Sequence, residues 1–154
     1  MDASKPWPFA SASAQAINSE HFIEHLTLEE ARAYFGEAYR VLRPGGLIRT
    51  TTPNLTGLSE IFLARHAAPL QVHRSHGYEA ATHGEMLNNY FYSWDHRHIY
   101  DFETLSHLLR RAGFVDVREE RYGQSAHEPL NGIDRHDPGE IPQTVLCVDA
   151  VKPA

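Results

Sequence analysis

The pattern of apolar and polar residues predicts a strand and then a capped helix near the start of the chain. Residues 14–18 form a short run of mostly small and apolar side chains, which is typical of a buried strand. Thr27 and Glu30 have the spacing of a capping box, and apolar residues then recur at helical intervals over 31–42. The Pro-Gly-Gly sequence at 44–46 is expected to end this helix.

The later part of the chain continues the alternation of strands and helices. Strands are predicted at 47–52, 114–121 and 144–151, and helices at 58–65 and 102–111. Such an order favours the α/β fold class, with a mostly parallel sheet and helices packed on its faces.

Two segments have no clear periodicity. Residues 66–93 are expected to be an irregular insertion with one short helix, and 122–143 a polar loop. Seven of the 11 histidines lie between His66 and His107. Because histidine binds metals and titrates near neutrality, this clustering invites a functional interpretation. For four of them we expect solvated loop positions: His66, His73, His76 and His83.

Length and charge narrow the function classes. The 154 residues predict a single domain, 1–154. Lysine and arginine total 14 against 20 acidic residues, so neither a nucleic-acid partner nor a polybasic membrane contact is expected. No apolar run reaches the length of a membrane-spanning helix. A lone cysteine, Cys147, excludes an internal disulfide and fits a reducing compartment, so we expect a cytoplasmic protein.

Candidate chemistry gathers where predicted strands end. Residues 18–25 and 51–54 follow two successive strands, and 94–101 precede the last helix. Since ligands of α/β sheets bind at the carboxyl ends of parallel strands, these polar segments are expected to meet at one edge. The order of His21, Glu24 and His25 also matches the H-x-x-E-H pattern of zinc peptidases. A metal-dependent hydrolase is therefore an alternative, which we do not favour because the pattern precedes the predicted helix cap.

Several motifs together resemble class I S-adenosylmethionine-dependent methyltransferases, and more narrowly a bacterial group of predicted, type 11-like methyltransferases of unassigned substrate. The similarity extends over nearly the whole chain. The motifs that carry it are Pro6-Trp7-Pro8-Phe9, Ser19-Glu20-His21-Phe22-Ile23-Glu24-His25-Leu26, Tyr39-Arg40-Val41-Leu42-Arg43-Pro44-Gly45-Gly46, Thr52-Pro53-Asn54, His96-Arg97-His98-Ile99-Tyr100-Asp101, Ala112-Gly113-Phe114 and Gly123-Gln124-Ser125-Ala126-His127.

The resemblance implies a partial Rossmann-like sheet. The four predicted strands would correspond to strands 4-5-7-6 of the family's seven-stranded order 3-2-1-4-5-7-6, with an antiparallel last strand. The family's first strand, its glycine-rich cofactor loop and its ribose-binding acidic residue would all precede Met1. We therefore expect a truncated chain, the C-terminal half of such an enzyme, without the glycine-rich segment.

The resemblance also implies site residues and a reaction. Asp2 and Ala3 correspond to the adenine contact, and Asn18, Ser19 and Glu20 to the cofactor and acceptor pocket. The implied reaction is methyl transfer from S-adenosylmethionine to a small-molecule acceptor, with His21 or His98 as the base. The contrasting alternative is a non-catalytic remnant or partner subunit that has no cofactor.

Two further expectations concern partners and metals. Strand 14–18 would lack its family neighbour, so we expect a homo-oligomer or a complementing chain at that edge. Some RNA 2′-O-methyltransferases and ubiquinone-pathway O-methyltransferases carry a similar Glu-x-x-Glu-His segment that binds a divalent ion. By that resemblance His21, Glu24 and His25 would be ligands, completed by His96 or His98. We favour the alternative that the histidines form hydrogen bonds in the pocket floor while Glu24 pairs with Arg97 or Arg49.

Overall fold

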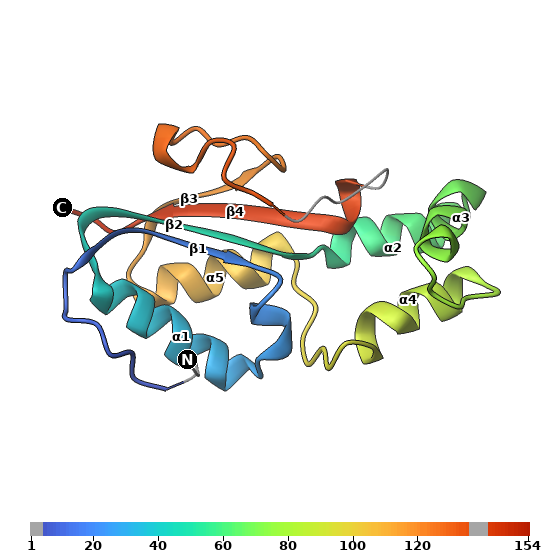
Figure 1. The fold of residues 1–154 in the computed structure, drawn as a ribbon, viewed down its shortest axis with the longest axis horizontal. Helices are drawn as coiled ribbons and strands as arrows, with labels where there is room; N and C mark the ends of the chain where they lie inside the picture. Colours follow the sequence, from blue (N-terminus) through green and yellow to red (C-terminus); the bar gives the residue numbers. More distant parts are fainter. Residues whose placement is uncertain (1–4, 136–141) are drawn as a thin grey trace.

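The fold is built on one four-stranded sheet, seen in a computed structural model that describes residues 5–135 and 142–154 (Figure 1). The strands are β1 (Ala14–Glu20), β2 (Leu42–Pro53), β3 (Val115–Glu120) and β4 (Val145–Val151), in the order β1-β2-β4-β3. β1 is parallel to β2, whereas β4 is antiparallel to both β2 and β3. Three strands thus share one direction and the last runs against them, which confirms the predicted 4-5-7-6 arrangement.

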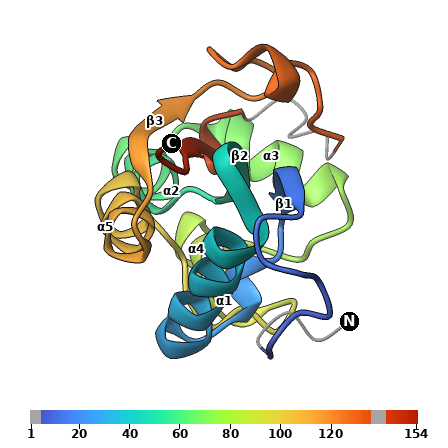
Figure 2. The same ribbon diagram turned by 90° about the vertical axis from the view of Figure 1, so that its left-hand side faces the viewer.

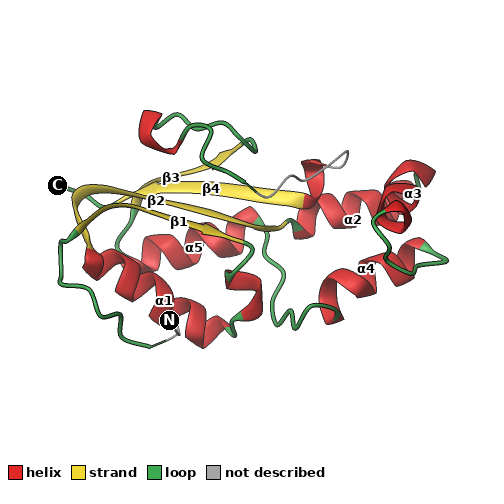
Figure 3. Ribbon diagram, viewed as in Figure 1, coloured by secondary structure: helices red, strands yellow, loops and turns green. Residues whose placement is uncertain are grey.

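Helices cover one face of the sheet and extend past its end. α1 (Leu28–Val41) and α5 (Phe102–Ala112) pack below the strands, as Figure 2 shows from the end of the sheet. α2 (Leu55–Ala64), α3 (Ala67–Ser75) and α4 (His83–Tyr92) lie beyond the end of β2 (Figure 3). None of the described helices is both long enough and apolar enough to span a bilayer.

The first helix forms as its sequence predicts. Thr27 Oγ1 accepts a hydrogen bond from the Glu30 backbone N–H, and the Glu30 carboxylate accepts one from the Thr27 N–H at 2.8 Å. These bonds satisfy two of the donors that a helix start leaves unpaired. The apolar residues of α1 that face the sheet are buried, as expected: Ala31, Tyr34, Phe35, Ala38 and Val41.

β2 begins earlier than the sequence predicts, at Leu42 instead of 47. α1 already ends at Val41, and the Pro-Gly-Gly sequence lies within the strand, where the β1–β2 register shifts between Ala14 and Ala16. Gly45 has a φ of +74°, and a β-carbon on Gly46 would lie 2.7 Å from the Arg43 carbonyl oxygen. Glycine at both positions therefore accommodates the irregularity in the strand.

The prediction of an irregular insertion over 66–93 was wrong. Two helices occupy it, and Thr82 caps α4 by accepting from the Glu85 N–H. They surround a small core separate from the main one, formed by Ile61, Leu70, Ala80 and Met86. α3 buries three residues and α4 only Met86, so the sequence carries no long apolar stripe. His73 is also not solvated: it is 3% exposed within this module.

The other face of the sheet is covered by the segment that follows β3. Arg49 of β2 is fully buried and binds Asp149 of β4 at 2.8 Å and Asp134 of this segment at 2.6 Å. Its guanidinium also donates to the Arg121 carbonyl. The expected pairing of Glu24 with Arg49 was therefore wrong. Arg49 lies on the face of the sheet opposite the helices, and its side chain binds Asp134 of the covering segment.

Candidate functional site

The three polar segments meet, as predicted, where β1 and β2 end. Glu20 pairs with Thr51 in the parallel ladder, and the His21 N–H donates to the Thr51 carbonyl at 3.0 Å. The N–H groups of Arg97 and His98 both donate to the Glu24 carbonyl, at 2.7 and 3.1 Å. The later loop is thus fixed against the segment after β1. Among the described residues, Glu24 and Arg97 are joined by this backbone hydrogen bond and not by their side chains.

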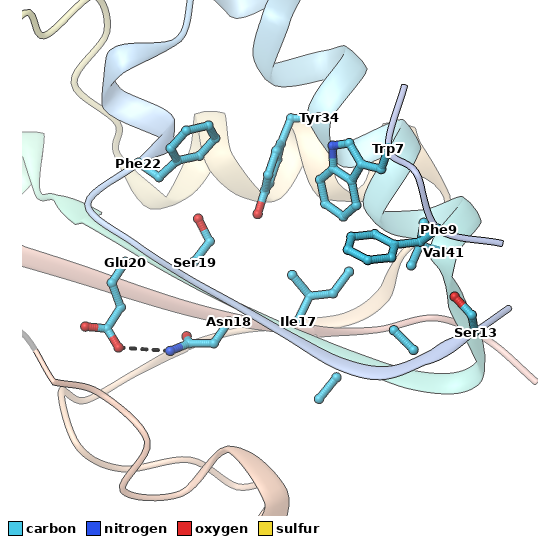
Figure 4. A pocket seen from close by; sticks show the side chains of 12 residues that line it. Trp7, Phe9, Ser13, Ile17, Asn18, Ser19, Glu20, Phe22, Tyr34 and Val41 are labelled. Carbon is cyan, nitrogen blue, oxygen red and sulfur yellow. Dashed lines mark hydrogen bonds between the residues drawn. The ribbon is translucent and has the colours of Figure 1, made fainter. Parts of the chain in front are cut away.

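A first cavity, of about 630 Å³, lies beside β1 (Figure 4). Three rings form a contiguous aromatic wall: Tyr34 is 5.3 Å from Trp7 and 5.4 Å from Phe22 between ring centroids. The hydroxyls of Ser19 and Tyr34 point toward one another in Figure 4, and burial raises the pKa of Tyr34. This cavity combines apolar faces with a few polar groups, the usual composition of a small-molecule site.

An ion pair on α1 holds the N-terminal side of this cavity. The Glu37 carboxylate accepts from the Trp7 N–H at 2.7 Å and binds Arg40 at 2.8 Å. Arg40 in turn donates to the carbonyls of Trp7 and Phe9. Hydrogen bonds from Arg40 and from the Trp7 backbone lower the pKa of Glu37 to about 2. The segment carrying Trp7 is therefore fastened to α1 by both backbone and side-chain groups.

The proposed cofactor residues are only partly gathered in this cavity. Asn18, Ser19 and Glu20 all line it. However, the Glu20 carboxylate also accepts from the Asn18 amide at 2.9 Å and from the Arg135 N–H at 3.0 Å, so it fastens the cover segment as well. Asp2 and Ala3 lie outside the described residues.

A second cavity, of about 350 Å³, adjoins the segment after β1 on its other side. Its lining combines the Glu24 carboxylate, several imidazoles and three larger aromatic rings. The residues concerned are His21, Glu24, His25, His76, His96, Tyr78, Tyr90 and Trp94. Ser19 and Glu20 line the first cavity and His21 lines the second, so the two cavities adjoin at consecutive residues.

His21 and Glu24 form a hydrogen-bonded pair at this second cavity. His21 Nδ1 lies 3.1 Å from Glu24 Oε1, and Thr52 Oγ1 donates to Glu24 Oε2 at 3.0 Å. A carboxylate accepts, so Nδ1 carries the proton of this hydrogen bond. His21 also has a φ of +44°, a strained value for a residue other than glycine. A buried acid that orients an imidazole is the arrangement of a general base.

A second set of groups converges beside this pair. The ligating atoms of Glu24, His25 and His96 all lie within 4.8 Å of one another. His96 Nδ1 donates to the Tyr90 carbonyl at 2.7 Å, which leaves Nε2 as its coordinating nitrogen. Of the H-x-x-E-H residues, Glu24 and His25 belong to this set and His21 does not, because His21 precedes the 3-10 turn instead of sharing one helix face with His25. The metal-ligand geometry of the peptidase motif is therefore not present.

His98, the other candidate base, lines neither of these cavities. Its ring packs on Tyr100 at 4.5 Å, and burial lowers the pKa of its imidazole. The histidine that the later loop contributes to the second cavity is His96.

Trp7, Phe9 and Phe22 belong to the motifs of the family resemblance, but no aromatic residue was predicted to line a cavity. Tyr34 was assigned to the apolar face of α1, and Tyr78, Tyr90 and Trp94 belong to the region that was predicted to be irregular. The density of aromatic residues over 78–94 was the available signal. Only the packing of α4 against α2 and α3 brings these rings to the same cavity as Glu24.

Comparison with known proteins identifies the fold. Residues 1–50 match the family described as methyltransferase domain. An Archaeoglobus fulgidus SAM-dependent methyltransferase is 19% identical with a TM-score of 0.57, over 94% of this chain and 62% of that one. A Thermotoga maritima SAM-dependent methyltransferase, a possible histamine N-methyltransferase, is 20% identical with a TM-score of 0.53, over 97% and 60%.

A third solved structure was determined with the cofactor bound. Haemonchus contortus phosphoethanolamine N-methyltransferase 2, in complex with S-adenosyl-L-methionine, is 15% identical with a TM-score of 0.59, over 99% of this chain and 36% of that one. The chain thus spans between about a third and two thirds of the lengths of these proteins. No curated protein sequence matches it significantly. The likeness in structure establishes the fold, that of part of a class I SAM-dependent methyltransferase.

Proposed function

Because the chain has a class I SAM-dependent methyltransferase fold, we propose that it takes part in methyl transfer from S-adenosylmethionine to a small-molecule acceptor. The observation that supports this most is the junction of the two cavities at Ser19, Glu20 and His21. A cofactor in the first cavity and an acceptor in the second would then lie on either side of the His21–Glu24 pair.

The residues of the first cavity fit part of such a cofactor. Trp7, Phe22 and Tyr34 offer ring faces to an adenosyl or methionyl group, and Ser19 offers a hydroxyl. The sequence contains no G-x-G-x-x-G loop, whose backbone amides commonly hold a nucleotide. The bound cofactor would supply an electrophilic methyl group on its sulfonium sulfur.

The His21–Glu24 pair supplies the proton chemistry in this proposal. His21 Nε2 accepts a proton from the acceptor, and the adjacent Glu24 carboxylate stabilises the imidazolium that forms. Thr52 holds the second oxygen of Glu24, so the carboxylate keeps its orientation. General bases of this kind contribute roughly 10²–10⁴-fold to the rate.

The β1 edge is the proposed contact with a second chain. Among the described strands β1 pairs with β2 alone, and Gln15, Ala16 and Asn18 are exposed along it. We propose that another copy or a complementing chain pairs there. Light scattering is expected to give a mass above that of one chain, with β1 amides protected in hydrogen exchange. A monomer with rapidly exchanging β1 amides would contradict this.

Binding of S-adenosylhomocysteine tests the main proposal. Calorimetric titration is expected to give micromolar affinity. With an acceptor found by screening, His21→Asn is expected to transfer the methyl group at a rate at least roughly 10²-fold below that of the wild type. Asparagine tolerates the positive φ of this position, so the variant should fold. The matched control is His107→Asn, at an exposed position on α5. Absence of binding up to millimolar ligand would favour the alternative of a non-catalytic subunit.

A divalent cation at Glu24, His25 and His96 is a second candidate, favoured by the convergence of their ligating atoms. Two imidazoles and a carboxylate suit Zn²⁺ or Mn²⁺, and such an ion would orient and acidify an acceptor hydroxyl. Mn²⁺ binding followed by electron paramagnetic resonance is expected to disappear in His96→Ala and to persist in His83→Ala. Equal binding by both variants would exclude this site.

A further inference from the structure

We infer that the second cavity binds a compact organic ammonium group, so that the acceptor is an amine. That this group is the methyl acceptor rests on the proposed function. That the cavity binds an ammonium group depends only on its lining, namely the rings of Tyr78, Tyr90 and Trp94 and the carboxylate of Glu24.

The three rings form walls that meet at steep angles. Tyr78 and Trp94 have centroids 4.9 Å apart and an interplanar angle of 82°, and Tyr90 and Trp94 are 5.9 Å apart at 67°. Parallel rings would leave a slot for a planar guest, whereas rings at these angles enclose a corner that suits a rounded group. Aromatic faces attract cations through the ring quadrupole, and tryptophan is the strongest of them.

The charge of the cavity points the same way. Glu24 is fully buried, and among the described residues its carboxylate bonds to the neutral hydroxyl of Thr52 and the imidazole of His21. Among the described residues that line the cavity there is no lysine or arginine. A buried carboxylate without a guanidinium or ammonium partner is costly, and a bound cation would offset that cost.

The rings are held in place from outside the cavity. His73 packs against both Tyr78 and Tyr90, at 5.0 and 5.7 Å, and the Tyr90 hydroxyl bonds to Thr144. Trp94 has a φ of +59°, a conformation that its large side chain disfavours. Strain of this kind persists only where the surroundings fix it, and the Trp94 indole packs against Tyr78.

The chemistry balances for an amine. The bound R–NH₃⁺ gives one proton to His21 Nε2, and the nitrogen lone pair then forms the N–CH₃ bond as the S–CH₃ bond breaks. The sulfonium becomes a neutral thioether and the product is R–NH₂⁺–CH₃, while the imidazolium later releases its proton to water. Because substrate and product are both cations, the aromatic corner and Glu24 can bind each of them.

Two probes of equal shape and different charge test the inference: choline and its neutral carbon analogue 3,3-dimethylbutan-1-ol. Titrations of chelator-treated protein are followed by calorimetry and by the indole N–H resonances of the two tryptophans. Choline is expected to bind about tenfold more tightly than the analogue and to shift Trp94 but not Trp7. Equal affinities would overturn the inference, as would a choline shift confined to Trp7.

Variants separate the ring faces from the charge. Trp94→Leu and Glu24→Gln are each expected to reduce choline affinity about tenfold and to leave the analogue unaffected. The control is Tyr92→Leu, which removes an aromatic residue that is 80% exposed and outside the cavity lining. If Trp94→Leu fails to fold, Trp94→Phe is expected to give an intermediate affinity. Choline binding unchanged in Trp94→Phe and Glu24→Gln would overturn the inference.

The S-adenosylhomocysteine titration keeps the two proposals distinct. Cofactor binding without choline binding would leave methyl transfer standing and exclude the ammonium site. Choline binding without cofactor binding would leave the ammonium site standing and contradict the methyltransferase proposal.

Discussion

Arg49 and Asp134, 85 residues apart in the sequence, are joined by two hydrogen bonds inside the protein, Nη2 to Oδ2 at 2.6 Å and Nε to Oδ1 at 2.7 Å. Both side chains are fully buried. Burial by itself would lower the pKa of Arg49, but the bonds to Asp134 and the charges of Asp134 and Asp149 raise it. This bidentate pair fixes the cover segment to the sheet, and Glu20, at the cavity junction, accepts from the next residue of that segment.

Replacing Arg49 with methionine is expected to lower the free energy of unfolding by about 3–5 kcal/mol, because Asp134 and Asp149 would remain buried without their cation. Denaturant titration measures this change. Arg43→Met, at an exposed position on the same strand, is expected to change stability by less than about 0.5 kcal/mol. Equal effects of the two variants would mean that the buried pair contributes nothing.

Gly57 and Gly36 are expected to respond to alanine in opposite directions. A β-carbon on Gly57 would lie 1.8 Å from the Gln143 carbonyl oxygen, so the packing of α2 must shift, at a cost of about 1–3 kcal/mol. Gly36 is exposed on α1 with no neighbouring atom within 4 Å of such a carbon. Gly36→Ala should therefore stabilise by about 0.5–1 kcal/mol. Thermal unfolding of both variants checks the pair.

Cys147 is expected to be unreactive until the protein unfolds. Burial raises the pKa of its thiol to about 12, so roughly one molecule in 10⁴ carries the thiolate at pH 8. Labelling with a disulfide reagent should be at least roughly 10³-fold slower than in denaturant, where the thiol pKa is about 8.5. Labelling of the native protein at the unfolded rate would show that β4 opens readily.

The α2–α4 module is expected to lose stability on mild acidification. His73 Nε2 accepts from the Asn89 amide, and burial lowers the pKa of His73, which the nearby charge of His76 lowers further. The unfolded chain then binds more protons, so this stabilisation is complete above about pH 6.5 and is lost as the pH falls through the folded pKa.

Thermal unfolding between pH 7.5 and 5 measures this effect. His73→Gln should reduce the dependence on pH, whereas His66→Gln, at an exposed position, should leave it unchanged. An unaltered pH dependence in His73→Gln would assign the effect to other groups.

Local signals in the sequence were sufficient for much of the fold. The capping box at Thr27 and the helix predicted at 102–111 were both confirmed, because capping depends on residues within one turn. The meeting of residues 18–25 with 51–54 also followed from the sequence, since parallel neighbours end at the same edge. The start of β2 and the helices at 67–75 and 83–92 did not, because packing overrode weak local preferences.

The candidate site divides in the same way. The sequence by itself determined which chemical groups are present, the His21–Glu24–His25 run and a later histidine-rich loop, because these follow from residue types and spacing. The tertiary structure alone decided that His96 joins Glu24, that Arg49 turns to Asp134, and that Tyr78, Tyr90 and Trp94 enclose a corner. The physical reason is that each of these contacts joins different elements, so its partners are set by how helices and sheet pack and not by local propensity.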